Sequence, residues 1–285
     1  MTLPLVVGVD GSDASLAAVD WAVDEAARGG LPLRLVYASL WERYEGAVPT
    51  NGSQRPAERV LAEHIVASAA ERAVRRNPGV KVTTAVRPED PVDALLHEGN
   101  NAFALVTGER GRGELKGLLL GSVGLGVAAR AHCPVIVVRG DETGLVGMHE
   151  RILFGAGDPG TGDRAVRFAL REAETRGCAL DVVRAWRWSP HEGTDHPARE
   201  QEERATAQLD ELLHEAVAAY PGALVRRMAV EGPPRRILVD RSAAADLVII
   251  GARRRHGHFG LQLGLVGHTL LHHAHCPVAV VPQLA

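Results

Sequence analysis

A glycine-rich stretch that ends in a serine has the residue types and spacing to bind an anion. It follows the pattern G-x2-G-x9-G-S, with its glycines at 108, 111 and 121. Gly108 and Gly111 allow the backbone to approach a ligand closely and to adopt φ > 0. Gly121, Ser122 and Val123 stand where a helix is predicted to begin, and the free N–H groups and dipole of a helix start attract phosphate. The chemistry that this pattern indicates is phosphate binding.

The pattern leaves two alternatives open. A chain of this composition would contain it about 0.02 times by chance, so accident explains it poorly, but the glycines could still serve only the fold. The Ser122 hydroxyl could donate a hydrogen bond to a phosphate oxygen, or it could cap the helix that follows.

A carboxylate near the N-terminus is the second candidate for a ligand contact. Asp10 falls at the end of an apolar run at 3–9. There its carboxylate could accept hydrogen bonds from an adenine amino group or a ribose hydroxyl. The alternative is that this segment only starts a helix, which is a common role for residues such as Ser12 or Asp13.

The elements that must position these residues occur twice, because the chain contains an internal repeat. RAHCPVIVV at 130–138 returns as HAHCPVAVV at 273–281, 143 positions later. Near the start of each copy LVVG at 5–8 matches ILFG at 152–155, so about four residues were gained or lost in between. A repeat of this length predicts two domains, residues 1–143 and 144–285.

Each copy alternates short apolar runs with helical stretches, four times over, and ends on a fifth run. In the first copy the runs lie at 3–9, 33–38, 80–86, 104–107 and 135–138. This alternation predicts an α/β fold with a doubly wound parallel sheet and helices on both faces. Connection rules leave two strand orders, 2-1-3-4-5 and 3-2-1-4-5. In the second order, ligands bind between strands one and four, where Asp10 would face the glycine-rich stretch.

These motifs resemble those of the universal stress protein family. The resemblance is carried by GVDGS at 8–12, the glycine pattern at 108–122 and CPVIVV at 133–138. It covers nearly the whole chain as two tandem copies, about 3–139 and 151–282. The resemblance implies, for each copy, a five-stranded parallel sheet of order 3-2-1-4-5 that binds ATP, or another adenine nucleotide, without needing to hydrolyse it.

The resemblance also implies residue roles and a partner. Asp10 and the backbone near Ala38 would contact adenine, Gly108 would lie by the ribose, and the helix start would lie by the phosphates, with or without Mg²⁺. The candidate nucleotide-binding residues are Asp10, Ala38, Gly108, Arg110, Gly111, Gly121, Ser122 and Val123. Family members pair through their last strand, so the runs at 135–138 and 278–281 could pair within the chain as a pseudo-dimer and cover two sheet edges. A further homodimer stays open.

The second copy departs from the binding pattern at three places. Arg254 replaces the second glycine, Leu265 replaces the serine, and Gly157 stands where the first copy has Asp10. An arginine side chain would take up volume that a nucleotide needs, although its charge could attract phosphate. We therefore expect a degraded nucleotide site in the second domain. The alternative is a relocated anion site that uses the arginines at 253–255.

Composition excludes several other classes of protein. The 285 residues carry a net charge of −3, which does not indicate nucleic acid as a partner, and no apolar run reaches the length of a membrane span. The three cysteines are scattered, and the first residues do not read as a signal peptide, so we expect a cytoplasmic protein. His268 and His272 have a spacing that can hold zinc, but no acidic residue lies near them in the sequence, and solvated or capping histidines are the simpler interpretation.

Three functions from different classes remain to be weighed. The chain could be a nucleotide-binding stress or regulatory protein, a slow ATPase or phosphotransferase, or a ligand-free scaffold. It has no G-x4-G-K-[ST] loop and no paired carboxylates beside the glycine pattern, which argues against an enzyme. Slow hydrolysis stays open, because Glu109 could orient a water molecule. We expect the first function.

Overall fold

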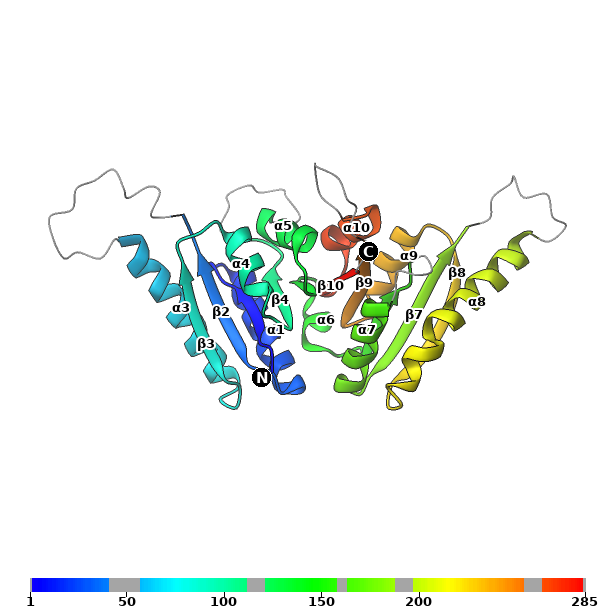
Figure 1. Ribbon diagram of the computed structural model, residues 1–285, viewed down its shortest axis with the longest axis horizontal. Coiled ribbons are helices and arrows are strands. Elements are labelled where there is room, and N and C mark those ends of the chain that lie inside the picture. The colour runs from blue at the N-terminus through cyan, green and yellow to red at the C-terminus, as the bar shows by residue number, and fades with distance from the viewer. Residues whose placement is uncertain are drawn as a thin grey trace. The chain divides into compact units, whose positions relative to one another are not determined.

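The computed structural model describes residues 2–40, 57–111, 121–157, 163–187, 197–253 and 263–283. The chain divides into two compact units, Met1–Val138 and Arg139–Ala285. Both units are α/β, each with one parallel sheet and helices on its two faces (Figure 1). The fold class predicted from the alternation of runs and helices is confirmed.

The sheet of the first unit has its first strand in the centre. Its strands pair in the order β3-β2-β1-β4-β5. They are β1 (Leu5–Gly8), β2 (Leu33–Ala38), β3 (Val82–Arg87), β4 (Ala104–Gly108) and β5 (Val135–Val138). This is the order 3-2-1-4-5 that the family resemblance implied. The order in which successive strands are added to the sheet reverses between β1 and β4. In such folds ligands bind at this point, at the carboxyl ends of the two strands.

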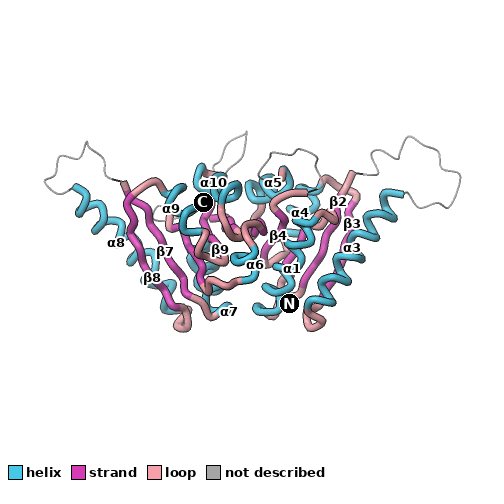
Figure 2. The backbone as a smooth tube through the Cα atoms, turned by 180° about the vertical axis from the view of Figure 1, so that it is seen from behind, coloured by secondary structure: helices cyan, strands magenta, loops and turns pink. Residues whose placement is uncertain are grey.

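The helices of the first unit cover the sheet in two pairs. They are α1 (Asp13–Gly29), α3 (Ala57–Arg76), α4 (Pro91–Gly99) and α5 (Ser122–Arg130). Helices α1 and α3 pack together on one face, and α4 and α5 pack together on the other (Figure 2). The Ser12 side chain caps the start of α1, and Gly30, with φ 61°, ends it. Asp90 caps α4 and is followed by Pro91 at its first position.

The second unit repeats this plan. Its strands are β6 (Arg151–Gly155), β7 (Ala179–Trp186), β8 (Leu224–Glu231), β9 (Leu247–Arg253) and β10 (Val278–Gln283). They pair in the equivalent order, β8-β7-β6-β9-β10. The helices are α7 (Asp163–Arg176), α8 (Pro197–Ala218), α9 (Pro234–Ser242) and α10 (Leu265–His273).

A short helix that the sequence pattern did not predict comes before β6. Helix α6 (Glu142–Val146) is capped by Asp141, whose side chain accepts from the N–H of Gly144, and ends at Gly147 with φ 78°. Asp before the helix and Gly after it are ordinary helix boundaries, so the signal was present. The helix has only five residues, too few to show a helical period.

The central strands are buried on both faces, and the outer strands are not. Strand β1 is buried up to Gly8, and β4 is buried up to Gly108. Strand β3, at the end of the sheet, has two exposed threonines, and β8 occupies the same place in the second unit with several exposed residues. An outer strand needs fewer apolar residues, because one side of it faces solvent.

Candidate functional site

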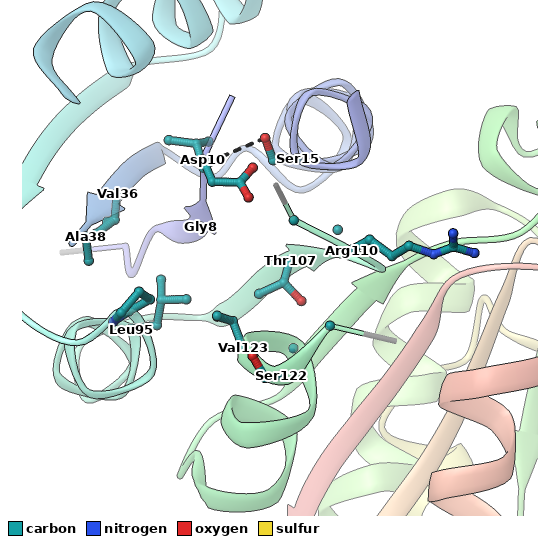
Figure 3. Close-up of a pocket in the computed structure, with 16 residues that line it drawn as sticks. Gly8, Asp10, Ser15, Val36, Ala38, Leu95, Thr107, Arg110, Ser122 and Val123 are labelled. Carbon is teal, nitrogen blue, oxygen red and sulfur yellow. Dashed lines mark hydrogen bonds between the residues drawn. The ribbon is translucent and has the colours of Figure 1, made fainter. Parts of the chain in front are cut away.

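A cavity of about 370 Å³ opens at the carboxyl ends of β1, β2 and β4 in the first unit (Figure 3). Its volume lies within the range of small-molecule sites. All eight residues predicted from the sequence line this cavity: Asp10, Ala38, Gly108, Arg110, Gly111, Gly121, Ser122 and Val123. The candidate binding residues from the sequence did not include the other eight that line it: Gly8, Val9, Ser15, Val36, Pro91, Leu95, Thr107 and Gly124.

Asp10 forms one wall and is held by the start of α1. Its Oδ1 accepts hydrogen bonds from the N–H of Ser12 at 2.9 Å and from the Ser12 hydroxyl at 2.6 Å. The helix cap is Ser12, whose hydroxyl also accepts from the N–H of Ser15. Asp10 is therefore not the capping residue, and Figure 3 shows its carboxylate turned into the cavity. This arrangement leaves Asp10 placed to accept hydrogen bonds from a ligand.

The first two glycines of the pattern serve close packing, and neither has a left-handed backbone. Gly108 and Gly111 do not have a positive φ, so the conformational freedom that glycine allows is not used at these two positions. A Cβ on Gly108 would lie 2.5 Å from the carbonyl oxygen of Ala14 in α1. A Cβ on Gly111 would lie 2.5 Å from Oδ2 of Asp10. Gly108 thus lets α1 approach the sheet, and Gly111 leaves room for the Asp10 carboxylate.

The start of α5 forms the opposite wall. Gly121 is its N-cap residue, without a side-chain cap, and Ser122 is its first residue. The Ser122 hydroxyl is therefore not the helix cap, which removes one of the two interpretations. The N–H of Gly121 donates to the carbonyl of Glu109 at 2.7 Å, which ties the helix start to the glycine-rich loop. The N–H groups of Ser122, Val123 and Gly124 have no acceptor within the helix and suit an anion.

The remaining wall is apolar and comes from β2 and α4. Val36, Ala38 and Leu95 line it. A Cβ on Gly8 would lie 2.9 Å from the Leu95 side chain, so the missing side chain lets α4 sit close to β1. Such a surface suits a flat apolar group such as a nucleobase.

An ion pair fixes α4 in this position. Glu98, near the end of α4, accepts from Arg34 of β2 at 2.7 Å and from Arg87 of β3 at 2.7 Å. Burial alone would raise the pKa of Glu98, but the two guanidinium groups that bond to it hold its pKa below the ordinary value. The pair anchors the helix that carries Leu95 without entering the cavity.

Arg110 is placed differently from the other predicted residues. It lies at the rim and is exposed, and Figure 3 shows its guanidinium directed away from Asp10 and Thr107. Its backbone carbonyl lies 3.5 Å from the Ser12 hydroxyl. Arg110 thus joins the loop to the start of α1 through its backbone, and its side chain is free to reach only what lies outside the cavity.

Thr107 is the most informative residue that sequence reasoning missed. It is the one polar side chain of β4, next to the last residue of the strand, is 4% exposed, and lines the cavity. A threonine that closes the run Ala-Leu-Val was the available signal. It passed unnoticed because threonine is common in strands.

The equivalent positions of the second unit carry different side chains. Ile250 stands in place of Thr107 and Leu265 in place of Ser122, and Leu265 is 74% exposed. Gly157, in place of Asp10, offers no carboxylate. Arg254, which replaces Gly111, lies outside the described residues.

The other groups singled out in the sequence do not form a reactive site in the described part of the chain. All three cysteines are buried and none of them forms a disulfide, and burial raises the pKa of the Cys276 thiol, which disfavours the reactive thiolate. The rings of His268 and His272 stack with centroids 4.5 Å apart. Among the described residues, no three His, Cys, Asp or Glu side chains are placed to hold a metal ion. No described helix is both long enough and apolar enough to cross a membrane.

Comparison with known proteins agrees with the fold and the repeat. Residues 1–139 and 148–282 each match the universal stress protein family. A universal stress protein of Mycobacterium bovis is 34% identical over an alignment of 290 residues that covers 98% of this chain and 97% of the relative. The crystal structure of a universal stress protein from Archaeoglobus fulgidus matches with a TM-score of 0.71 at 20% identity, over 99% of this chain and 98% of that chain.

The crystal structure of a universal stress protein in complex with cAMP is 30% identical. The match covers 49% of this chain and 98% of the chain in that structure, with a TM-score of 0.38. The family match extends over both units, and the mycobacterial relative is similar along its whole length. The chain therefore belongs to the universal stress protein family and carries two copies of its domain in tandem.

Proposed function

We propose that the first unit binds one ATP per chain and that the protein is a nucleotide-dependent regulator in a stress response. The observation that carries this proposal is the cavity itself. The start of α5 and the carboxylate of Asp10 lie on opposite sides of it, and an apolar wall lies between them along its edge. A nucleotide has the matching parts: anionic phosphates, a sugar and base with hydrogen-bond donors, and a flat apolar ring. Family membership supports the regulatory role.

Each part of ATP has a place in this proposal. Val36 and Leu95 would pack against the adenine ring, beside the backbone of Ala38. The Asp10 carboxylate would accept from the adenine amino group or a ribose hydroxyl, or would hold Mg²⁺. The first N–H groups of α5, with the Ser122 hydroxyl, would bind the phosphates.

We further propose that bound ATP is held without turnover. Asp10 is the only carboxylate among the described residues that line the cavity. Its Oδ1 already accepts two hydrogen bonds from Ser12, so one of its two oxygens is engaged as an acceptor at the start of α1. Phosphate release from radiolabelled ATP should therefore stay at the rate of the buffer alone.

Mass spectrometry of the ligand released from freshly purified protein is the first test. About one ATP per chain is expected, and isothermal titration of ligand-free protein should give one site. No nucleotide on the purified protein, together with no heat of binding, would overturn the proposal. Two tight sites per chain would overturn the restriction to the first unit and favour the anion site at 253–255.

A matched pair of variants tests the location. A Cβ on Gly121 would meet its nearest atoms, in the loop at 109–111, at 3.5 Å, an ordinary contact distance, so Gly121→Ala adds a methyl group at the cavity wall without a clash. Gly264, the N-cap residue of α10, has nothing within 4 Å of its Cβ position, and Gly264→Ala reproduces any cost to the helix cap. Gly121→Ala should weaken ATP binding about tenfold or more, and Gly264→Ala should leave it unchanged. Equal affinities in the two variants would place the site elsewhere.

A further inference from the structure

The hydroxyl of Thr107 is buried and has no hydrogen-bond partner among the described residues. The residue is 4% exposed and is the next-to-last residue of β4, before the glycine loop. Buried hydroxyl groups nearly always have a partner, because an unpaired one forfeits the hydrogen bonds that it made with water. An unpaired group of this kind at the wall of a ligand cavity suggests that its partner is the ligand.

Strand geometry and the second unit together show where the Thr107 side chain points. Side chains alternate along a strand, and the Cβ position of Gly108 faces α1, so Thr107 faces the other side, where α4 and α5 lie. Figure 3 shows its hydroxyl directed toward the labelled Ser122 and Val123, which line the cavity as Thr107 does.

Ile250 occupies the same place in the second unit and marks out the space. Its Cγ2 lies 3.2 Å from a Cβ placed on Gly155, and its Cδ1 lies 3.2 Å from a Cβ placed on Gly267. The equivalents of these two glycines are Gly8 and Gly124, which both line the cavity of the first unit. A side chain at this position therefore lies between the end of the first strand and the first turn of the helix that follows the loop.

We propose that Thr107 is a further binding residue, whose hydroxyl donates a hydrogen bond to a phosphate oxygen of the bound nucleotide. This inference rests on the proposed function. The first turn of α5 attracts anions, because its free N–H groups point into the space that Thr107 borders. An anion bound at that turn would lie beside the Thr107 hydroxyl and could accept its hydrogen bond. A hydrogen bond to a charged acceptor is stronger than one to a neutral acceptor.

The tests compare Thr107→Val, which keeps the shape and removes the hydroxyl, with Thr107→Ser, which keeps the hydroxyl. Calorimetry with ATP should show binding about 10- to 100-fold weaker for Thr107→Val and close to wild type for Thr107→Ser. With adenosine, which has no phosphate, all three proteins should bind alike. A loss of adenosine affinity equal to the loss for ATP would overturn the assignment to phosphate and indicate the ribose instead.

Stability of the ligand-free variants separates binding from a structural role. Without nucleotide, Thr107→Val should melt at the same temperature as wild type or higher, because it removes an unpaired buried polar group. If the hydroxyl serves the fold, this variant melts lower, and the inference fails. Unchanged ATP affinity in Thr107→Val also overturns it, whereas no ATP binding by the wild-type protein overturns the proposed function instead.

Discussion

The two units keep the residues that shape the fold and differ in those that line the cavity. Gly8 and Gly155 end the first strand of each unit, and in both a Cβ would lie within 2.9 Å of a leucine side chain, Leu95 or Leu238. The helix start after the loop is a glycine N-cap in both, Gly121 and Gly264. The strand order is also the same. Two chain segments of the same ancestry thus retain one packing solution.

At the cavity, polar residues of the first unit become apolar or absent in the second. Thr107 becomes Ile250, Ser122 becomes Leu265 and Asp10 becomes Gly157. None of these changes disturbs the sheet, whose strands keep their order and direction. The comparison teaches that the fold and the lining of the cavity can change independently in this chain, since few residues serve both.

Two of the differences are sterically linked. In the first unit Gly111 has no side chain, and the Asp10 carboxylate lies where a Cβ would be. In the second unit the carboxylate is missing at position 157, and the equivalent of Gly111 is an arginine at position 254. Loss of the aspartate removes the reason for the glycine, so the two changes are expected to occur together.

The largest expected effect is on ATP affinity, and it comes from replacing Thr107 of the first unit with isoleucine, the residue at the equivalent position 250 of the second unit. Thr107→Ile removes the hydroxyl and fills the space between Gly8 and Gly124, as Ile250 does between Gly155 and Gly267. We expect ATP affinity to fall by at least about 100-fold, because the hydrogen bond and the volume are lost together. Titration calorimetry measures it, with the melting temperature as the check on folding.

The reverse variant sharpens this prediction. Ile250→Thr should leave the stoichiometry at one ATP per chain, because the second unit still has Leu265 and Gly157 in place of the serine and the carboxylate. Retained ATP binding in Thr107→Ile would show that the cavity is not the site. A second ATP in Ile250→Thr would show that a single side chain keeps the second unit empty.

The next effect is on the free energy of unfolding and is expected to differ between two equivalent glycines, Gly108 of β4 and Gly251 of β9. Alanine at position 108 would place its Cβ 2.5 Å from the backbone oxygen of Ala14, whereas alanine at position 251 would meet the Gln283 side chain at 3.1 Å. A backbone cannot move aside as a side chain can, so we expect Gly108→Ala to cost about 3 kcal/mol of unfolding free energy and Gly251→Ala less than about 1 kcal/mol. Urea unfolding of the full chain decides, and equal costs would contradict the packing argument.

Local patterns in the sequence predicted the parallel sheet and left two strand orders, and the family resemblance pointed to the observed order and to eight residues that line the cavity. Short apolar runs, a repeat and a spaced set of glycines are readable without coordinates. What could not be read is what each glycine faces. Gly108 was expected to face a ligand, but its Cβ position faces α1, which is a contact between segments almost a hundred residues apart.

The missed lining residues have the same explanation. Val36 and Leu95 lie on apolar runs that look like any core segment, and only the meeting of β2 with α4 turns them into a wall. Thr107 and Ser15 are single hydroxyls on buried elements. Their importance depends on what surrounds the hydroxyl, which no pattern along the chain specifies.

A smaller effect tests the link between Asp10 and Gly111. Gly111→Ala should cost about 1 kcal/mol, because the new methyl group would displace a carboxylate held by Ser12. In an Asp10→Gly background the same change should cost almost nothing, so the two costs would not add. Urea unfolding of the two single variants and the double variant measures the coupling, and additive costs would break the argument that the second unit lost both features together.

The smallest effect is a pH dependence confined to the second unit. Burial, with His268, His273 and Arg139 nearby, lowers the pKa of His272, and the equivalent residue of the first unit is Ala129. The imidazole of His272 therefore takes up a proton more readily in the unfolded chain than in the folded one. Above about pH 6.5 the ring is neutral in both states, and the folded state keeps its full stability. That stability is lost as the pH falls from there toward the lowered pKa of the folded state. His272→Gln should therefore melt at a less pH-dependent temperature between pH 7.5 and 5.5 than wild type, and Ala129→Gln should follow the wild-type profile. If His272→Gln and wild type respond to acid alike, burial at this position does not distinguish the two units.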